Sequence, residues 1–249
     1  MSEALFNKQK VLIVGGTRNI GLAIATDFMR HGADICIIGG YSKSNLKEAL
    51  QKISKVNGSG SVCGKIADMS KRADVENVFT FFDECYNEPP RILINCQGYR
   101  PHNILAEISD SEWDQVMNRN VKGPFITSQE FFKRVPGSVT ASIVNIGGLS
   151  AHKPAKERAH VITSKAAIIG LTRALAEEGR NHIKVNCIVP GVIDTKREIG
   201  QPQAAFINDN EFLKGSTSDV SEAVLYFANP NTVYITGQTL HVNGGRFMP

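Results

Sequence analysis

The chain has 249 residues and a mass of 27.2 kDa, which is enough for one large domain with a substantial core and excludes a peptide-sized binding module. With 42% hydrophobic, 21% charged and 7% aromatic residues, the composition is typical of a soluble globular protein and excludes a mainly disordered chain. The net charge is only +4 and the basic residues are scattered, so nucleic acid is not an expected partner.

Short apolar runs and helical patterns alternate along the first half of the chain. The run at 11–14 ends in Gly15 and Gly16, and a helical pattern follows as far as the stop signal at His31 and Gly32. The same alternation predicts further strands at 35–38, 61–66 and 92–95, and further helices at 45–56 and 73–86.

The second half continues the alternation with longer helices. Ser109, with Glu112 three residues later, predicts a capping-box start for a helix that runs past Val121. The segment 162–178 predicts a helix with apolar residues on two faces, which indicates that a partner chain covers the second face. Strands are predicted at 141–146, 184–189 and 239–242.

Strands and helices that alternate throughout predict an α/β fold, namely a Rossmann-like, doubly wound parallel sheet with helices on both faces. No linker rich in Pro, Gly or Ser and no repeat divides the sequence, so residues 1–249 are expected to form a single domain. The weakly patterned stretch 191–218 is long for a connection and is interpreted as a lid over a substrate pocket.

Cysteine usage and the absence of long apolar runs bear on location. The five cysteines form no close-spaced pair and no basic-then-apolar leader opens the chain, which indicates a reducing cytoplasm with the thiols as small core residues. No run of about 18 uninterrupted apolar residues predicts a membrane span. No spacing of His, Cys or Glu predicts a metal site. We therefore expect a cytoplasmic protein without a metal or a membrane partner.

Several short motifs follow one another in a fixed order. The turn 14–21 (VGGTRNIG) opens the first helix, and 234–245 (YITGQTLHVNGG) lies close to the end of the chain; between them come Asp68, Asn95, Gly98, Asn120, Lys165, Pro190 and Gly191. Through this ordered set, over nearly its whole length, the chain resembles the short-chain dehydrogenase/reductase (SDR) family. The resemblance implies a Rossmann-like fold and hydride transfer between a nicotinamide dinucleotide and an alcohol or carbonyl.

The resemblance also implies where catalytic residues would lie. In this family a tyrosine four residues before the lysine transfers the alcohol proton, and a serine thirteen residues before that tyrosine holds the substrate oxygen. Counting back from Lys165 places Val161 at the tyrosine position and Gly148 at the serine position. We therefore predict that both catalytic groups have been lost from a retained scaffold and that no catalytic set is intact. The remaining Asn120 and Lys165 are expected to tie helix to sheet through hydrogen bonds.

Dinucleotide binding is expected to be weakened as well. Asn19 replaces the middle glycine of the turn, Gly39 stands where a carboxylate would hold the ribose, and Gln97 replaces a small alanine. Asn tolerates left-handed backbone angles, so the turn itself can still form. The family's binding positions that remain are Gly15, Gly21, Asp68, Asn95, Gly98, Pro190, Gly191, Ile193 and Thr195. We expect NAD(P) in the assembled complex, without tight binding to this chain.

These losses predict a catalytically silent subunit of a hetero-oligomeric, NAD-dependent short-chain dehydrogenase, expected to be a tetramer, whose active paralogue acts on a hydroxyacyl (CoA-type) alcohol. The sequence resembles the inactive member of paired-subunit dehydrogenases, such as the one that oxidises a hydroxy(phenyl)methyl-succinyl-CoA alcohol in anaerobic toluene degradation. Two alternatives stay open: an enzyme with altered proton transfer through His160 or a lysine, and a small-molecule or nucleotide sensor. His160 is interpreted as a surface or interface residue, because on a helix it points about 100° away from position 161.

Overall fold

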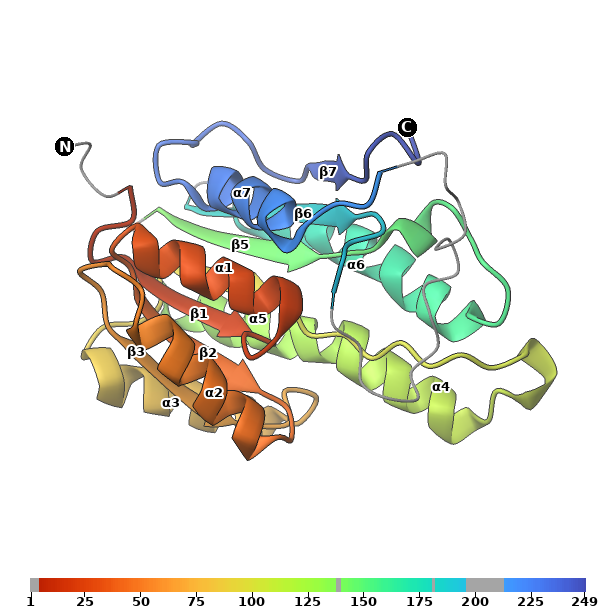
Figure 1. The fold of residues 1–249 in the computed structure, drawn as a ribbon, viewed down its shortest axis with the longest axis horizontal. Helices are drawn as coiled ribbons and strands as arrows, with labels where there is room; N and C mark the ends of the chain where they lie inside the picture. The colour runs from red at the N-terminus through yellow and green to blue at the C-terminus, as the bar shows by residue number, and fades with distance from the viewer. Residues whose placement is uncertain (1–4, 138–139, 181, 196–212) are drawn as a thin grey trace.

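The computed structural model describes residues 5–137, 140–180, 182–195 and 213–249. Its centre is a seven-stranded parallel sheet in the order β3-β2-β1-β4-β5-β6-β7 (Figure 1). The strands are β1 (Lys10–Val14), β2 (Asp34–Gly39), β3 (Val62–Ile66), β4 (Ile92–Asn95), β5 (Ala141–Ile146), β6 (Ile183–Pro190) and β7 (Thr239–Val242). The α/β, doubly wound architecture predicted from the sequence is confirmed.

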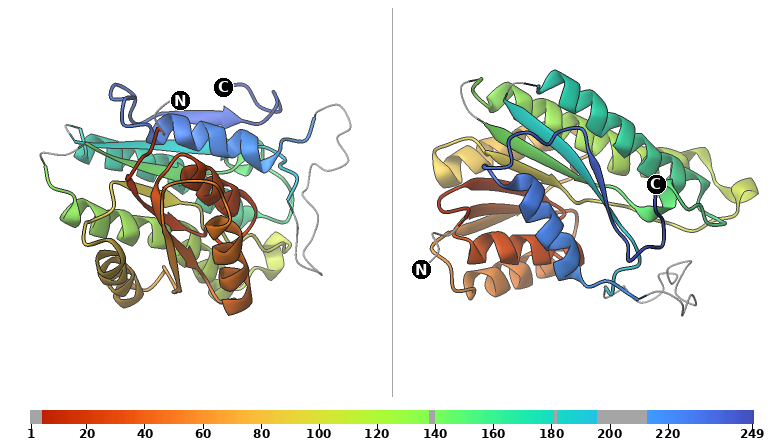
Figure 2. Two further views of the ribbon diagram at one scale, coloured as in Figure 1. Left: turned by 60° about the vertical axis from the view of Figure 1, so that its left-hand side comes forward. Right: turned by 90° about the horizontal axis from the view of Figure 1, so that it is seen from above.

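Helices cover both faces of the sheet (Figure 2). One layer consists of α1 (Asn19–Arg30), α2 (Lys43–Ser54) and α7 (Thr217–Ala228), and the other of α3 (Arg72–Tyr86), α5 (Gly123–Arg134) and α6 (Ala159–Glu178). The sheet divides the interior into two apolar cores, because alternate residues of each strand point to opposite faces. In β1, for example, Val11 and Ile13 belong to one core and Leu12 and Val14 to the other.

The register of the strands places their carboxyl ends along one edge. Val14 of β1 lies opposite Ile38 of β2 and Asn95 of β4. The strand order reverses at β1, because β2 and β3 extend to one side and β4 to β7 to the other. In open α/β sheets, ligands bind in the crevice at such a switch point, outside the carboxyl ends of the strands.

One helix in the C-terminal third was not predicted, and the lid predicted beside it stays a prediction. The sequence patterns left α7 unassigned, and its first residues, Thr217 and Ser218, fall within the stretch interpreted as a lid. The helix begins with a capping box in which Ser216 and Asp219 exchange hydrogen bonds, a signal that was present in the sequence. Most of the proposed lid, 196–212, lies outside the described residues. Its described ends meet, since Ile193 and Gly215 form a parallel bridge.

The helix predicted after Ser109 has an irregular middle. It begins as α4 (Asp110–Met117), passes through a π-helical turn at Asn118–Lys122 and continues as α5. Ser109 accepts a hydrogen bond from the backbone N–H of Glu112, which is the cap that the sequence predicted. Single-turn π segments inside α-helices are frequent at functional sites, so this turn indicates a functional site nearby.

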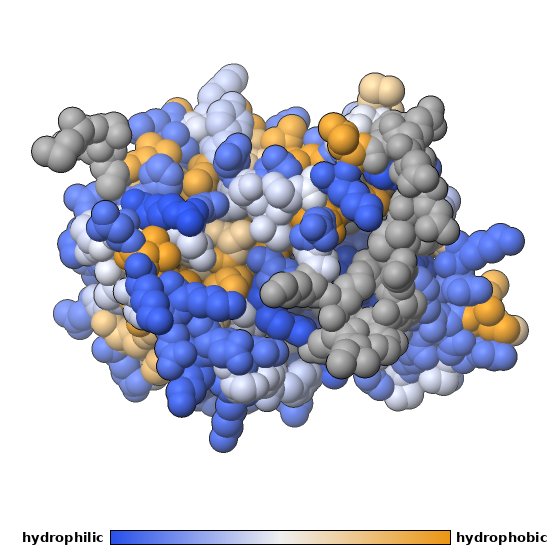
Figure 3. Space-filling model, in the orientation of Figure 1, coloured by the Kyte–Doolittle hydropathy of each residue, from blue (hydrophilic) through white to orange (hydrophobic). Residues whose placement is uncertain are grey.

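The second apolar face predicted for α6 is partly covered by the chain itself. Ile169 is buried beside Ile168 in a small core with β6, while Ile162 stays half-buried and Ala166 exposed. The molecular face that carries α1, α2 and α7 is mainly hydrophilic with scattered apolar residues (Figure 3). Among the described helices, none has the length and apolar character needed to cross a lipid bilayer.

Candidate functional site

The glycine-rich turn after β1 is formed as the sequence predicted. Gly15 (φ 83°) and Asn19 (φ 48°) both adopt left-handed backbone conformations, which glycine and asparagine tolerate. A Cβ on Gly21 would lie 2.0 Å from the carbonyl oxygen of Gly15, so only glycine lets α1 pack this closely on the turn. Arg18, exposed at the N-cap of α1, adds a cation at a helix N-terminus. This end of the crevice suits a phosphate group.

The end of β2 offers no acidic group for a ribose. Gly39 is its last residue, and a Cβ there would lie 2.9 Å from Cγ2 of Thr17 and 3.0 Å from Cδ1 of Ile66. Neighbouring side chains therefore close around the position where the family carries a carboxylate. The next large side chain, Tyr41, is exposed beyond the strand.

Three side chains stack across the adenosine half of the crevice. The guanidinium carbon of Arg119 lies 5.1 Å from the ring centroid of Tyr41 and 4.7 Å from that of Tyr99. Tyr41 follows β2 and Tyr99 follows β4, which are the neighbours of β1, so this Arg119 stack spans the switch point. Cation–π contacts of this kind hold an arginine in place at about 0.5–2 kcal/mol each.

Asp68 lies at the same end of the sheet and keeps its charge. It accepts hydrogen bonds from the backbone N–H of Ser70 at 3.1 Å and from the Ser70 hydroxyl at 2.7 Å. Although burial acts in the opposite direction, these bonds and the charges of Lys71 and Arg119 hold the pKa of Asp68 below its ordinary value. The carboxylate that the family uses toward adenine thus faces the charge of Arg119.

Asn95 and Gln97 turn inward at the end of β4. The Asn95 side-chain amide donates to Oδ1 of Asn145 at 2.9 Å and to the Ser128 hydroxyl at 3.3 Å. A Cβ on Gly123 would lie 3.1 Å from Nε2 of Gln97, so the Gln97 amide is directed at the start of α5. Gly98 is exposed and lies beside Lys165, whose Nζ is 3.8 Å from the position of a Cβ on that glycine.

The corner between β5 and α6 holds both positions that motif spacing predicts for the family's tyrosine and serine. Val161, at the position that motif spacing predicts for the proton-transferring tyrosine, is only 1% exposed and packs as hydrocarbon. A Cβ on Gly148 would lie 3.4 Å from Cγ of Lys165, an ordinary van der Waals distance, so a serine could fit there but is absent. No hydroxyl or phenol stands at either position.

Lys165 is buried in this corner and bonded to the backbone. Its Nζ donates to the carbonyl oxygen of Ile146 at 3.1 Å. Burial, together with the positive charge of Arg100, lowers the pKa of Lys165 from 10.5 to about 8. The amine therefore exchanges its proton much more readily than a surface lysine does.

Asn120 sits in the π-helical turn and joins three segments. Its Oδ1 accepts from the backbone N–H of Tyr99 at 2.7 Å, and its Nδ2 donates to the Tyr99 carbonyl at 2.9 Å and to the Ser164 hydroxyl at 2.9 Å. The residue is buried. These bonds connect the loop after β4, the π turn and α6, and none of them reaches the sheet to which Asn120 was expected to tie a helix.

His160 is buried inside the chain, so the expectation of a surface or interface residue is wrong. It is 0% exposed, and its Nε2 lies 2.8 Å from Oε1 of Glu112 on α4. The imidazole packs between α6 and α4 within one chain because α4 crosses that face of α6. Trp113, on the same short helix, is 39% exposed.

The residues predicted for the nicotinamide end follow β6. Pro190 ends that strand, and the N–H of Gly191 donates to the carbonyl of Val242 at 2.8 Å. A Cβ on Gly191 would lie 2.7 Å from Cα of Asn243, so this glycine permits close contact with the C-terminal segment. Ile193 takes part in the bridge described above, and Thr195 is the last described residue before the gap.

The two halves of the crevice fit the family's dinucleotide unequally. The glycine turn and the N-terminus of α1 suit a pyrophosphate, whereas the Arg119 stack lies across the adenosine half, and Gly39 offers no group for the ribose. The described residues therefore fit the pyrophosphate of a dinucleotide better than its adenosine and ribose. Within the ranges that the structure describes, no group of three or more His, Cys, Asp or Glu residues is arranged to hold a metal ion.

Comparison with known proteins decides the family. A family model described as "Enoyl-(Acyl carrier protein) reductase" matches residues 14–246. The chain belongs to the short-chain dehydrogenase/reductase family. It is 31% identical over 253 residues to 3-oxoacyl-[acyl-carrier-protein] reductase FabG of Chlamydia muridarum, covering 98% of this chain and 99% of that protein. It is 28% identical over 247 residues to a (3R)-3-hydroxyacyl-CoA dehydrogenase of Canis lupus familiaris, covering 95% of each.

Solved SDR structures share the fold across the whole domain. A dehydrogenase/reductase from Sinorhizobium meliloti superposes with a TM-score of 0.89 at 24% identity, covering 98% of this chain and 96% of that one. A short-chain dehydrogenase/reductase from Serratia marcescens superposes with a TM-score of 0.86 at 25% identity, covering 96% of this chain and 98% of that one. The backbone fold of these structures is thus shared over nearly the whole chain.

Sequence reasoning did not find the Arg119 stack. Tyr41, Tyr99 and Arg119 are far apart in the chain and belong to none of the family's motifs described above. A signal was nevertheless present, because each directly follows or precedes a motif position: Gly39 and Gly40, Gly98, and Asn120. In a parallel sheet such positions gather at one edge.

Proposed function

We propose that this SDR chain is the catalytically silent subunit of a hetero-oligomeric, NAD-dependent dehydrogenase, in which an active paralogue carries out the chemistry. The observation that carries the proposal is the buried Val161 at the proton-transfer position. A general acid–base typically contributes about 10²–10⁴ in rate, and a hydrocarbon supplies none of it.

The rest of the corner gives no replacement for the lost hydroxyls. Gly148 has no side chain to hold a substrate oxygen, and the Lys165 amine donates a hydrogen bond to the carbonyl oxygen of Ile146. In the family the lysine acts on the tyrosine, which is absent here. An alkoxide or carbonyl oxygen placed in this corner would therefore find neither a proton donor nor an oriented hydroxyl.

The surface of α6 is suited to contact with another helix. Its exposed positions are mostly small, with Thr163, Ala166, Gly170 and Ala174 following one another at helical spacing. Small side chains let a second helix approach closely. Nearby on the α4–α5 helix, Trp113 is 39% and Phe125 is 42% exposed. A related chain in a heterotetramer would bury these side chains, and each chain would stabilise the other.

The names of two relatives support a substrate class for the proposed active partner. Two of them are named for acyl substrates, one a 3-oxoacyl-[acyl-carrier-protein] reductase and one a 3-hydroxyacyl-CoA dehydrogenase. By analogy the active partner would oxidise a hydroxyacyl thioester alcohol. A paired dehydrogenase for a hydroxy(phenyl)methyl-succinyl-CoA alcohol of anaerobic toluene degradation is one enzyme of this kind.

An enzyme with altered proton transfer is the second candidate, and Lys165 is the residue that favours it. Its pKa of about 8 would let the amine act as acid or base near neutral pH. His160 does not favour it, because its ring is engaged with Glu112 away from the corner. A small-molecule or nucleotide sensor without turnover remains the third interpretation, and no particular described residue favours it.

Native mass spectrometry of the complex from its own cells tests the proposal. We expect a second SDR chain with Ser, Tyr and Lys in the family's catalytic positions. Activity on hydroxyacyl-CoA alcohols should survive Lys165→Met in this chain and disappear when the partner's tyrosine is replaced. A homo-oligomer that turns over substrate, and loses turnover with Lys165→Met, would instead support the altered-chemistry enzyme.

A further inference from the structure

Three cysteines far apart in the sequence meet on the outer side of the sheet. Cys36 of β2 and Cys63 of β3 are direct neighbours in the strand register. Cys85 is the residue before the last in α3, the helix that covers this face. The Cys63 thiol interacts with the thiols of both Cys36 and Cys85, and all three cysteines are free.

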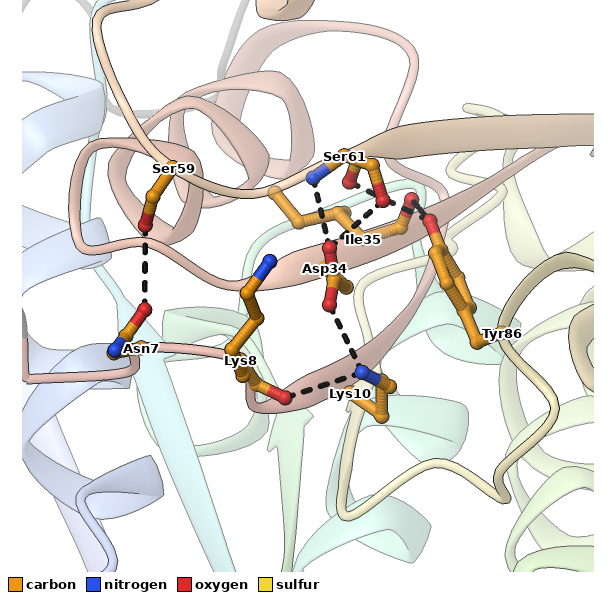
Figure 4. Close-up of polar contacts among 8 residues, drawn as sticks. All are labelled: Asn7, Lys8, Lys10, Asp34, Ile35, Ser59, Ser61 and Tyr86. Carbon is orange, nitrogen blue, oxygen red and sulfur yellow. Dashed lines mark hydrogen bonds and ion pairs between the residues drawn. The ribbon is translucent and has the colours of Figure 1, made fainter.

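A polar frame fixes the end of α3 against these strands (Figure 4). The hydroxyl of Tyr86 donates to the carbonyl of Ile35 at 2.5 Å, and Asp34 accepts from the Ser61 hydroxyl at 2.7 Å and from Lys10 at 2.9 Å. Because Tyr86 adjoins Cys85 and Ile35 adjoins Cys36, these bonds hold together the two segments that carry Cys85 and Cys36.

The three thiols differ in character. Hydrogen bonds from Cys36, and after it Cys85 and Tyr86, lower the pKa of the Cys63 thiol to about 7 although burial opposes them. A hydrogen bond to Cys63, together with burial, raises the pKa of Cys36 well above its ordinary value. Burial raises the pKa of Cys85 to about 12. Of the three thiols, Cys63 therefore loses its proton most readily, which makes it the nucleophile of the cluster.

We propose that Cys63 and Cys85 form a peroxide-sensitive pair that closes into a disulfide. The Cys63 thiolate attacks one oxygen of hydrogen peroxide, the O–O bond breaks, and hydroxide leaves, so that sulfur is oxidised to a sulfenic acid. The Cys85 sulfur then attacks the Cys63 sulfur, losing its proton, and the sulfenic oxygen leaves as water. Peroxide supplies the oxidising equivalents for the whole sequence.

Position in the fold selects Cys85 as the partner. Both Cys63 and Cys85 are half-buried, and β3 is an edge strand, so peroxide and solvent reach this side of the cluster. Cys36 is 0% exposed in a strand bonded on both sides, which prevents the backbone adjustment that disulfide geometry requires. Cys85 lies in the last turn of α3, which ends at Asn87 in a left-handed conformation.

Peptide mapping after peroxide treatment of the full-length protein at neutral pH tests this pair. We expect one intramolecular link between Cys63 and Cys85, with the loss of two hydrogen atoms in the intact mass and full reversal by dithiothreitol. Cys63→Ser should abolish the link. Cys85→Ser should leave a Cys63 sulfenic acid that dimedone captures, a readout that a merely structural thiol would not give.

One matched variant serves as a control. Cys187→Ser replaces a buried thiol outside the cluster and should still form the Cys63–Cys85 link. Circular dichroism checks that each variant is folded. A Cys36–Cys63 link, a sulfinic acid on Cys63 without any link, or a Cys63 that peroxide leaves unchanged would each overturn the proposal.

Discussion

The two ends of the crevice, the glycine turn after β1 and the corner between β5 and α6, have kept different things. At the turn, Gly15 and Asn19 have left-handed angles and Gly21 permits close contact, which suits a phosphate at the N-terminus of α1. At the corner, the backbone is equally well formed, but Val161 and Gly148 carry no reactive group.

The difference teaches which features the fold itself requires. The glycines of the turn are also packing residues, because a side chain on Gly21 would collide with the backbone of Gly15 and separate α1 from the sheet. At the corner, Val161 is buried and a Cβ on Gly148 would meet only ordinary contacts, so packing there requires neither a phenol nor a hydroxyl. The packing of the fold thus constrains the glycine turn more strongly than the side chains of the corner.

Gly21→Ala gives the largest expected effect and attacks the retained end. The new Cβ would lie 2.0 Å from a backbone oxygen, so α1 must shift, and we expect the free energy of unfolding to fall by about 3 kcal/mol or more. Urea unfolding measures it. Gly40→Ala is the matched control, because a Cβ there meets nothing within 4 Å. Similar losses in both variants would contradict a special role for the turn.

Lys165→Met sharpens the comparison at the corner through its pH dependence. The folded-state pKa is about 8 and the ordinary value 10.5, so the unfolded state holds more protons in between, and Lys165 makes the wild-type protein more stable as pH rises through that window. We expect Lys165→Met to be the more stable protein at pH 8 and to lose about 2 kcal/mol of that advantage by pH 10.

Urea unfolding at several pH values measures this difference between the two proteins. Lys156→Met, at an exposed position, is the control and should leave the slope of the wild-type curve unchanged. If Lys165→Met shows a pH dependence parallel to that of the wild type, the amine is not buried at a cost.

Arg119→Ala asks whether the retained turn can still serve a dinucleotide. Because the Arg119 stack spans the adenosine half, we expect its removal to strengthen NAD(P) binding about tenfold, or about 1.4 kcal/mol, measured by calorimetry. Arg72→Ala, at an exposed arginine on α3, should change nothing. Weaker NAD(P) binding by Arg119→Ala would mean that Arg119 contacts the dinucleotide and does not obstruct its binding.

Gly148→Ala has the smallest expected effect and tests whether the corner is only chemically empty. A Cβ there meets Lys165 at ordinary distances and the backbone is extended, so stability should change by less than about 0.5 kcal/mol. At the adjacent Gly147 a Cβ would lie 3.0 Å from Sγ of Cys187, and the same substitution should cost about 1 kcal/mol. Equal effects would show that the serine position has closed.

Much of the fold could be predicted because its signals are local. Strands β4, β5 and β7 have the predicted bounds, since apolar runs flanked by turns define them. Helix α7 was missed because it lies beside a long unpatterned stretch, although Ser216 and Asp219 mark its start.

The candidate site was predictable only where motif spacing defines it. Counting from Lys165 located the buried Val161, but nothing local shows that His160 would pack on Glu112 or that Arg119 would lie between Tyr41 and Tyr99. Such contacts join residues tens of positions apart and depend on how helices cross. The meeting of Cys63 with Cys85 escaped notice for the same reason.

The π-helical turn at Asn118–Lys122 inserts one wider turn between the α-helical segments α4 and α5. Relative to an uninterrupted α-helix, it offsets all residues downstream by one position, which is about 100° of rotation. Deleting one residue from the turn would restore ordinary pitch, release Asn120 from Tyr99 and swing Phe125 relative to Trp113. A single insertion or deletion at this turn would thus rotate every side chain of α5 about the helix axis at once.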